Sequence, residues 1–258
     1  MIPQRPERPH IMVHCAAQRC QRWTSNFRQS GIRLVDRALV MGAVGYAHDD
    51  PQAVVAGCQM WRELGARAVP GVGHMLSRVH GHHERSAWLD QAVWTDAAKW
   101  IDYFVAHVPR CTDIVVDLEP YWDGDDRFTW LADNPELVVA MSPLWQAFRR
   151  HGVRPWIMPG GHLYHYCAWI PRDLAWVCLS ELTFTDHADA DLARLRAWAA
   201  RVRCAFIPGL TCNHIRDGGR ALAQRGVRAA WIHFSGPDAA DYWNFGLVPW
   251  FLQRGAAS

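Results

Sequence analysis

Eight short apolar segments, rich in β-branched residues, recur along the chain and alternate with stretches of helical hydrophobic period. Their hydrophobicity is nearly continuous, which is typical of strands buried on both faces of a parallel sheet. The predicted strands are residues 11–15, 38–44, 66–72, 113–119, 154–158, 175–182, 204–210 and 229–234.

The intervening stretches carry apolar residues on one helical face. In residues 51–64, for example, positions 54, 55, 58, 61 and 64 are apolar. The other predicted helices are 86–108 (one long helix or a pair), 135–151, 189–202, 217–225 and 239–252. A glycine follows three of them directly before the next strand, at Gly65, Gly152 and Gly226, which is the expected left-handed cap of a helix.

Strand–helix alternation repeated about eight times predicts an α/β fold, a (β/α)₈ TIM barrel. A doubly wound open sheet is the alternative, but the chain has no G-x-G-x-x-G or Walker-type loop to favour it. No linker, repeat or low-complexity tract interrupts the pattern. We therefore expect a flexible N-terminal tail over residues 1–9 and a single barrel domain over residues 10–258.

Composition narrows the possible partners. The formal net charge of +2 is too small to indicate nucleic-acid binding, and no apolar run is long enough to span a membrane. The eight cysteines lack paired C-x-x-C motifs, so we expect reduced, buried thiols in a cytoplasmic protein, with a disulfide between neighbouring elements as the alternative. No cofactor is expected. Many of the 15 tryptophans lie in helical apolar stripes and are expected in the core.

The richest segment for chemistry is the end of the fourth predicted strand. Asp117 and Glu119 lie two residues apart, so in a strand they share one face and are separated by roughly 6.6 Å of backbone. Two neighbouring acids raise each other's proton affinity, which suits a general acid with a helper. Pro120 then ends the strand, and Tyr121 and Trp122 offer rings for stacking on a substrate.

This segment resembles the strand-four D-x-E signature of chitinase-type glycoside hydrolases (family 18) over about ten residues. In that family the glutamate protonates the glycosidic oxygen, and the aspartate orients the acetamido group of the substrate. The resemblance implies that Glu119 is the acid and Asp117 its helper. The chain departs from the pattern at Val115, where a further aspartate is usual, and it lacks the family's motifs on strands six and eight.

Glu181, in the sixth predicted strand, is the best second carboxylate. The fourth and sixth strands are not adjacent in a barrel, so Glu181 is expected to face Glu119 across its mouth. A separation of roughly 5–5.5 Å would imply retention of the anomeric configuration and roughly 6.5–9.5 Å inversion. A helix-facing or arginine-paired Glu181 is an equal alternative.

Other polar and aromatic residues follow the predicted strands, at the end where TIM barrels carry their chemistry. We expect stacking on sugar rings from Tyr121, Trp122, Tyr164 and Trp243, and hydrogen bonds to hydroxyls from His74, His162, Asn213 and His233. The opposite ends carry mainly arginine and are expected to be a solvated bottom face: Arg67, Arg154, Arg203 and Arg228.

The favoured function is thus glycoside hydrolysis on a carbohydrate or other small-molecule substrate. Two alternatives remain open. His14, His74, His162 and His233, with Asp117 and Glu119, would suit a metal-dependent hydrolase. The barrel would otherwise bind carbohydrate without catalysis. The missing G-x-S-x-G elbow and the helical position of the only lysine, Lys99, disfavour serine-esterase and Schiff-base mechanisms.

Overall fold

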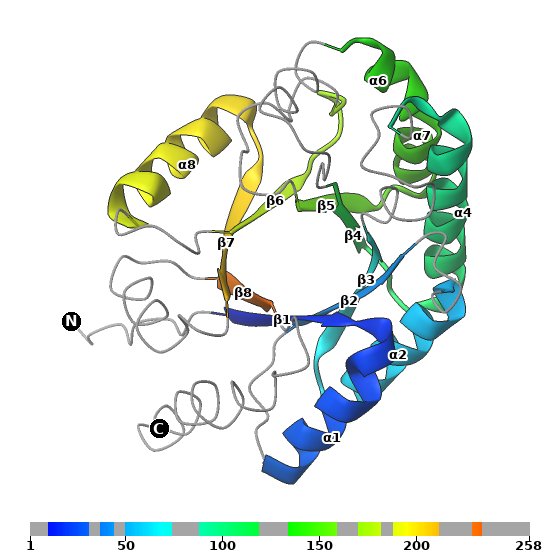
Figure 1. Ribbon diagram of the computed structural model, residues 1–258, viewed down its shortest axis with the longest axis vertical. Helices are drawn as coiled ribbons and strands as arrows, with labels where there is room; N and C mark the ends of the chain where they lie inside the picture. The colour runs from blue at the N-terminus through cyan, green and yellow to red at the C-terminus, as the bar shows by residue number, and fades with distance from the viewer. Residues whose placement is uncertain are drawn as a thin grey trace, which may run out of the picture.

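The computed structural model describes residues 10–30, 37–43, 50–73, 88–118, 134–158, 170–181, 188–211 and 229–233. Within them, eight parallel strands close into a barrel in sequence order, with helices around the outside (Figure 1). The strands are β1 (His10–Ala16), β2 (Arg37–Ala43), β3 (Arg67–Gly73), β4 (Asp113–Asp117), β5 (Arg154–Met158), β6 (Val177–Glu181), β7 (Ala205–Thr211) and β8 (Ala229–His233). The predicted TIM barrel is confirmed, and each predicted strand end lies within two residues of the observed one.

The strand register identifies the type of barrel. Following the paired residues once around, from β1 through β8 and back to β1, ends eight residues away from the starting point. Eight strands with a shear of eight is the geometry of the TIM barrel. This geometry tilts the strands, so their side chains fill the barrel in layers. In TIM-barrel enzymes the active site lies at the carboxyl ends of the strands.

The described helices lie outside the barrel in the expected alternation (Figure 1). They are α1 (Cys20–Ser30), which follows the 3₁₀ turn η1 (Ala17–Arg19), α2 (Pro51–Glu63), α4 (Gln91–His107), α6 (Glu136–Ala140), α7 (Ser142–His151) and α8 (Ala188–Val202). The predicted helix 135–151 is divided at Met141, because Pro143 lies in the first turn of α7 and favours a helix start there. Helices predicted over 217–225 and 239–252 lie outside the described residues.

The helix α1 was not predicted. Its sequence is mostly polar, and its buried residues include Trp23 and Phe27, one turn apart. Phe27 packs edge-on against Trp61 of α2, with ring centroids 5.2 Å apart. Two large rings at i and i+4 anchor this helix, and that is too sparse a pattern to be recognised in the sequence.

Local signals explain where the helices begin and end. Asp50 and Asp90 cap α2 and α4 by accepting hydrogen bonds from the backbone N–H groups of Ala53 and Ala92, at 2.6 and 2.9 Å. Gly65 and Gly152 have left-handed φ angles of 85° and 61°, as expected of helix caps. The corresponding connections before β4 and β7 use arginines with positive φ, Arg110 and Arg203.

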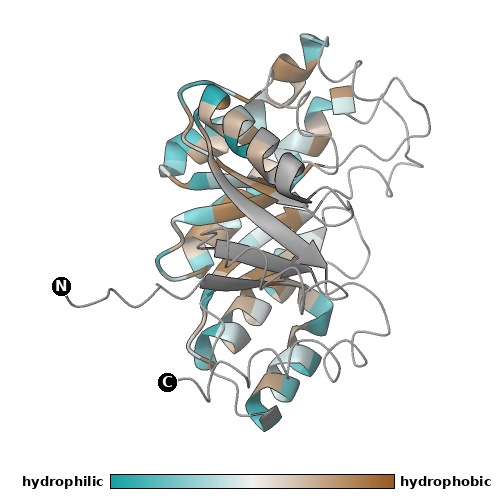
Figure 2. Cartoon of the chain, turned by 90° about the vertical axis from the view of Figure 1, so that its left-hand side faces the viewer, coloured by the Kyte–Doolittle hydropathy of each residue, from teal (hydrophilic) through white to brown (hydrophobic). Residues whose placement is uncertain are grey.

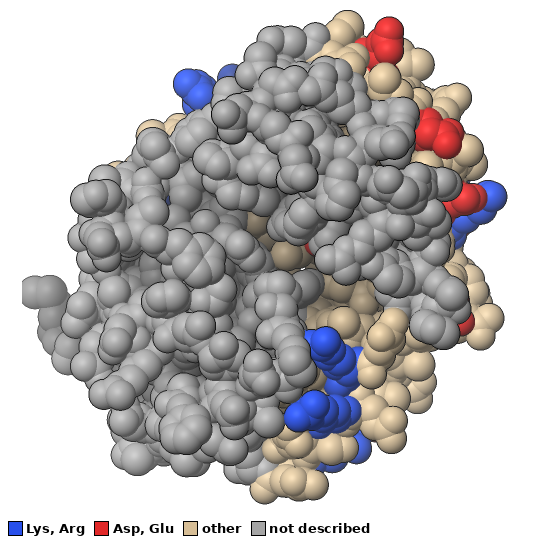
Figure 3. All heavy atoms as spheres, viewed as in Figure 1, with Lys and Arg blue, Asp and Glu red and all other residues tan. Residues whose placement is uncertain are grey.

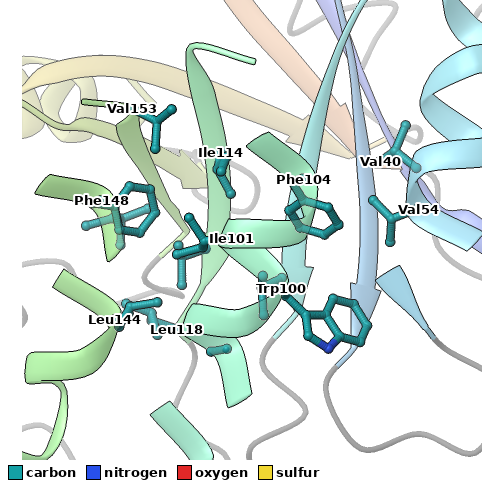
Figure 4. Close-up of a cluster of buried hydrophobic side chains, with 14 of the residues drawn as sticks. Val40, Val54, Trp100, Ile101, Phe104, Ile114, Leu118, Leu144, Phe148 and Val153 are labelled. Carbon is teal, nitrogen blue, oxygen red and sulfur yellow. The ribbon is translucent and has the colours of Figure 1, made fainter. Parts of the chain in front are cut away.

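The buried residues form two cores, one between the barrel and its helices and one inside the barrel. Figure 4 shows part of the outer core, in which side chains of α4 and α7 meet those of β4. In Figure 2 the strands that are drawn in colour are largely hydrophobic, and the helices carry both hydrophilic and hydrophobic residues, as expected of helices with one buried face. The inner core consists of Leu39, Met41, Val69, Val115, Trp156, Met158, Val177 and Leu179.

Charged side chains join the outer helices at the surface. Asp102 of α4 accepts hydrogen bonds from Arg150 and from His151 Nε2 (2.7 Å) of α7. Acidic and basic groups lie next to one another along this edge (Figure 3).

None of the described helices combines the length and apolar character needed to cross a membrane.

Candidate functional site

Of the two acids predicted at the end of the fourth strand, Asp117 is the one that lies within the described residues. It is the last residue of β4, at the carboxyl end of the barrel, and only 7% of it is exposed. Val115, two residues earlier, belongs to the core inside the barrel. Because side chains alternate along a strand, Asp117 shares that inward direction. A carboxylate therefore reaches the barrel interior at the end where TIM-barrel enzymes carry their chemistry.

The opposite face of β4 holds the strand in this orientation. Ile114, Val116 and Leu118 are at most 2% exposed and belong to the outer core. Figure 4 shows Ile114 and Leu118 among side chains of α4 and α7, including Ile101 and Phe148. A shift of the β4 register by one residue would turn these aliphatic side chains into the barrel and Asp117 toward the helices. The packing of the outer face thus fixes the direction of the acid.

The floor below Asp117 is apolar. On β5 the register partner of Asp117 is Met158, which is 3% exposed. One layer deeper in the barrel, Val115 is paired with Trp156. Gly71 of β3 is paired with Val115 and leaves room for Met41, whose sulfur lies 2.1 Å from where a Cβ at Gly71 would be. Among the described side chains, those of β2 to β6 pack against one another beneath the acid. The carboxyl end of the barrel is therefore the side from which a substrate would approach Asp117.

A second buried carboxylate closes the opposite end of the barrel. Asp113, the first residue of β4, is 3% exposed. Its Oδ1 accepts hydrogen bonds from Arg154 Nε at 2.8 Å and from Trp156 Nε1 at 3.0 Å. Its Oδ2 accepts from Arg67 Nη2 at 2.5 Å and from Thr112 at 2.8 Å. Arg67 and Arg154 are exposed, as predicted for the bottom face, and both also bind this buried acid.

The electrostatics of Asp113 follow from this arrangement. Burial opposes ionisation of the carboxyl group, but the hydrogen bonds from Thr112, Arg154 and Trp156 and the charge of Arg154 outweigh it. Together they hold the pKa of Asp113 below its ordinary value. Arg37 of β2 lies over the Trp156 ring, 5.2 Å from its centroid, and extends the cationic cluster. These contacts stabilise the end of the barrel opposite the candidate site.

Some of the other predicted site residues lie in described strands. Glu181 is the last residue of β6, and β5 lies between β6 and β4, as the prediction of non-adjacent strands requires. His14 of β1 and His233 of β8 are register partners across their two strands. The remaining predicted site residues lie outside the described part of the chain: His74, Glu119, Tyr121, Trp122, His162, Tyr164, Asn213 and Trp243.

Among the described side chains, no group of three or more His, Cys, Asp or Glu residues is arranged to hold a metal ion. The side chains of His14, Glu181 and His233 are not among those described. None of the six described cysteines forms a disulfide. Burial, with the nearby charge of Asp113, raises the pKa of Cys111 to about 12, so this thiol stays protonated.

Comparison with known proteins finds relatives by structure. No family model and no curated protein matches the chain by sequence. Among solved structures, a β-mannanase from Thermomonospora fusca in complex with mannohexaose has a TM-score of 0.55 at 13% identity, over 88% of this chain and 78% of that one. The catalytic domain of a mannanase from Streptomyces sp. SirexAA-E has a TM-score of 0.53 at 10% identity, over 88% and 75%. At these identities the likeness establishes the TIM-barrel fold that the chain shares with these glycoside hydrolases.

Residues that surround the acids were not predicted. Met41 and Met158 form the floor of the candidate site, and Asp113 closes the lower end of the barrel. Sequence pattern did not indicate them, because each lies in a run of apolar residues with no distinguishing period. Asp113 and Arg154 begin neighbouring strands and are register partners, a pairing that the sequence analysis did not derive.

Proposed function

We propose that this protein is a glycoside hydrolase in which Glu119 is the general acid and Asp117 its helper. The observation that carries the proposal is the position of Asp117: a buried carboxylate at the carboxyl end of β4, on the face that lines the barrel. The apolar floor and the packed outer face of β4 hold it there. A rigid acid at this place in a TIM barrel is suited to orienting a substrate or a neighbouring proton donor.

Glu119 enters through the continuation of β4. The backbone N–H of Leu118 donates to the carbonyl oxygen of Met158 at 2.8 Å, so the pairing with β5 runs one residue beyond the strand. Leu118 itself is fully buried in the outer core. Continued alternation would turn Glu119 to the same side as Asp117. The two acids would then act together, Glu119 giving its proton to the glycosidic oxygen.

Glu181 is proposed as the second carboxylate of the reaction. It follows Leu179 by two residues, and Leu179 belongs to the core inside the barrel. With β5 between β6 and β4, the position lies across part of the barrel mouth from Asp117. There a carboxylate would serve either as the nucleophile of a retaining mechanism or as the base of an inverting one.

The substrate class is proposed from the aromatic residues and the neighbours. Rings at Tyr121, Trp122, Tyr164 and Trp243 would stack on the apolar faces of sugars, with His74, His162, Asn213 and His233 binding hydroxyl groups. Both reported neighbours above a TM-score of 0.5 are mannanases. β-Mannan is therefore the first polysaccharide to test, followed by chitin, cellulose and xylan.

The test is release of reducing ends from these polysaccharides by the purified protein and by Glu119→Gln. General acid catalysis contributes about 10²- to 10⁴-fold, and the variant should lose at least that lower factor while melting at the same temperature. Glu136→Gln is the matched control, because Glu136 is exposed at the start of α6 and should be neutral. Full activity in Glu119→Gln would refute the proposed acid. Binding without hydrolysis, unchanged by Glu119→Gln, would indicate a carbohydrate-binding barrel instead.

One observation favours a second candidate, a metal-dependent hydrolase. His14 and His233 are register partners near the carboxyl ends of β1 and β8, which brings two imidazole-bearing positions together. Imidazole with a carboxylate such as Asp117 is a common ligand set for catalytic zinc. Stoichiometric metal in the purified protein, lost in His233→Ala together with activity, would support this candidate. Metal-free protein with activity that survives chelation would exclude it.

A further inference from the structure

The thiols of Cys15 and Cys20 lie in contact, outside the site described above. Cys15 is the penultimate residue of β1 and Cys20 the first of α1, and both are fully buried. Cys20 Sγ donates to Cys15 Sγ at a distance of 3.6 Å. Both thiols also approach the carbonyl oxygen of Ala16, at 3.3 Å from Cys15 and 3.6 Å from Cys20. The two sulfurs are thus held against each other by the short connection between β1 and α1.

We propose that Cys15 and Cys20 are an oxidisable pair that peroxide converts into an intramolecular disulfide. The Sγ–Sγ distance in a disulfide is about 2.05 Å, so the sulfurs have to approach by about 1.5 Å. The five-residue spacing already places them on adjoining elements that face one another. Ala16 and Gln18, which lie between the two cysteines in the sequence, are exposed to solvent. A small oxidant therefore has to pass only the short connection between β1 and α1 to reach the thiols.

The reaction balances with peroxide as the oxidant. One thiolate sulfur attacks the O–O bond of hydrogen peroxide, becomes a sulfenic acid and releases one water once its leaving oxygen is protonated. The second sulfur then attacks the sulfenic sulfur and expels the second water. Two thiols lose two electrons and two protons in total, and hydrogen peroxide is reduced to two waters. Burial and the neighbouring Cys20 raise the pKa of Cys15, so oxidation is expected to be slow at neutral pH and faster in alkali.

A third thiol tests which pair reacts. Cys58 of α2 is 1% exposed, and the adjacent Gly57 lets α2 approach closely: a Cβ there would lie 2.8 Å from Cys20 Sγ. Among the described cysteines, Sγ–Sγ contact is found for Cys15 and Cys20, so the disulfide should link these two and leave Cys58 reduced. Cys58→Ser is therefore the matched control.

The experiment is peptide mapping of the folded, reduced protein after treatment with hydrogen peroxide. Remaining thiols are alkylated in denaturant, and trypsin then cuts between Arg19 and Cys20. The expected product is the peptide ending at Arg19 joined to the tripeptide 20–22, two hydrogens lighter than the separate peptides and separated again by dithiothreitol. It should form equally in Cys58→Ser and be absent in Cys20→Ser. Alkylated Cys15 and Cys20 after treatment, or a link from Cys20 to Cys58, would overturn the proposal.

Thermal melting gives a second readout that does not depend on the variants folding. A disulfide that closes so short a loop in its native geometry should raise the melting temperature of the oxidised wild-type protein by about 3–8 °C. Dithiothreitol should reverse the rise. A melting temperature that falls on formation of the Cys15–Cys20 link would contradict the claim that the folded protein holds the two sulfurs ready. Neither result depends on hydrolytic activity, so this proposal and the proposed function can fail separately.

Discussion

The carboxylate at the lower end of the barrel provides a sharp test of how the fold is held together. Asp113→Asn keeps the size and shape of the side chain but removes its charge. The carboxylate accepts hydrogen bonds from Arg67, Arg154, Trp156 and Thr112. On whichever side the amide nitrogen replaces an oxygen, it presents N–H donors to groups that are themselves donors. The variant therefore loses both the ion pairs and part of the hydrogen bonding.

The size of the expected loss in stability depends on how deeply each partner of these ion pairs is buried. Removing one partner of a buried pair costs about 3–5 kcal/mol, and a hydrogen bond to a charged group contributes about 1.5–3 kcal/mol. Asp113 is 3% exposed, but the side chains of Arg67 and Arg154 are 46% and 45% exposed. Water can replace the lost partner of these arginines, which lowers the cost. We expect Asp113→Asn to reduce the free energy of unfolding by about 2–4 kcal/mol.

The pH dependence has a definite sign. The pKa of Asp113 is lowered in the folded protein, so the carboxylate stabilises the fold fully at pH values above the unfolded pKa of about 3.9. That stabilisation is lost as the pH falls through the lower, folded pKa. The difference in free energy of unfolding between wild type and Asp113→Asn should be constant from about pH 5 to 8 and shrink below about pH 4.

Urea unfolding at pH 7, repeated at low pH, measures both effects. Asp173→Asn is the control, because Asp173 forms a two-point ion pair with Arg149 at the exposed surface, at 2.7 and 2.8 Å. That pair is solvated on both sides, and its loss should leave the unfolding midpoint unchanged. The reasoning fails if Asp113→Asn is as stable as Asp173→Asn. It also fails if the stability difference persists undiminished at pH 3.

Two further predictions concern the packing of the barrel and of its helices. Gly71→Ala should lower the free energy of unfolding by about 1–3 kcal/mol in urea titrations, because its Cβ would lie 2.1 Å from Met41 Sδ and 3.0 Å from Val115 Cβ; the same substitution made in a Met41→Ala chain should cost less. Asp102→Asn should cost about 0.5 kcal/mol at pH 7, since its partners Arg150 and His151 join α4 to α7 at a half-exposed site. Burial opposes ionisation of Asp102, but Arg150 and His151 outweigh it and lower its pKa, so this contribution should begin to fall once the pH drops below about 4 and be lost as the pH passes through the lower, folded pKa.

Local signals were sufficient for most of the secondary structure. The eight strands are short and apolar, and the described helices α2 and α4 begin at capping aspartates; each of these features depends on residues close together in the chain. The glycine caps at Gly65 and Gly152 were predicted for the same reason. The helix α1 was missed because its stability comes from two rings that pack against another helix, a contact that no local pattern contains.

The candidate site was located by sequence to the end of β4, and the orientation of its acid was decided by the fold. Ile114, Val115 and Val116 are all apolar and all buried, so the strand offers no alternation from which to read its inner face. Packing against α4 and α7 makes Val115 and Asp117 the residues that face inward. A strand covered on both sides hides its own orientation, and only its neighbours supply it.

The sequence alone thus determined that the chain forms eight strands alternating with helices, and that an acid, Asp117, ends the fourth strand. Tertiary structure decided the shear that closes the barrel, the meeting of Asp113 with Arg67 and Arg154, and the contact of Cys15 with Cys20. The physical reason is the range of the interactions. Hydrophobic period and capping act over a few residues. Ion pairs join residues up to 49 positions apart, and the register pairs His10 with Ala229, 219 positions away (229 − 10).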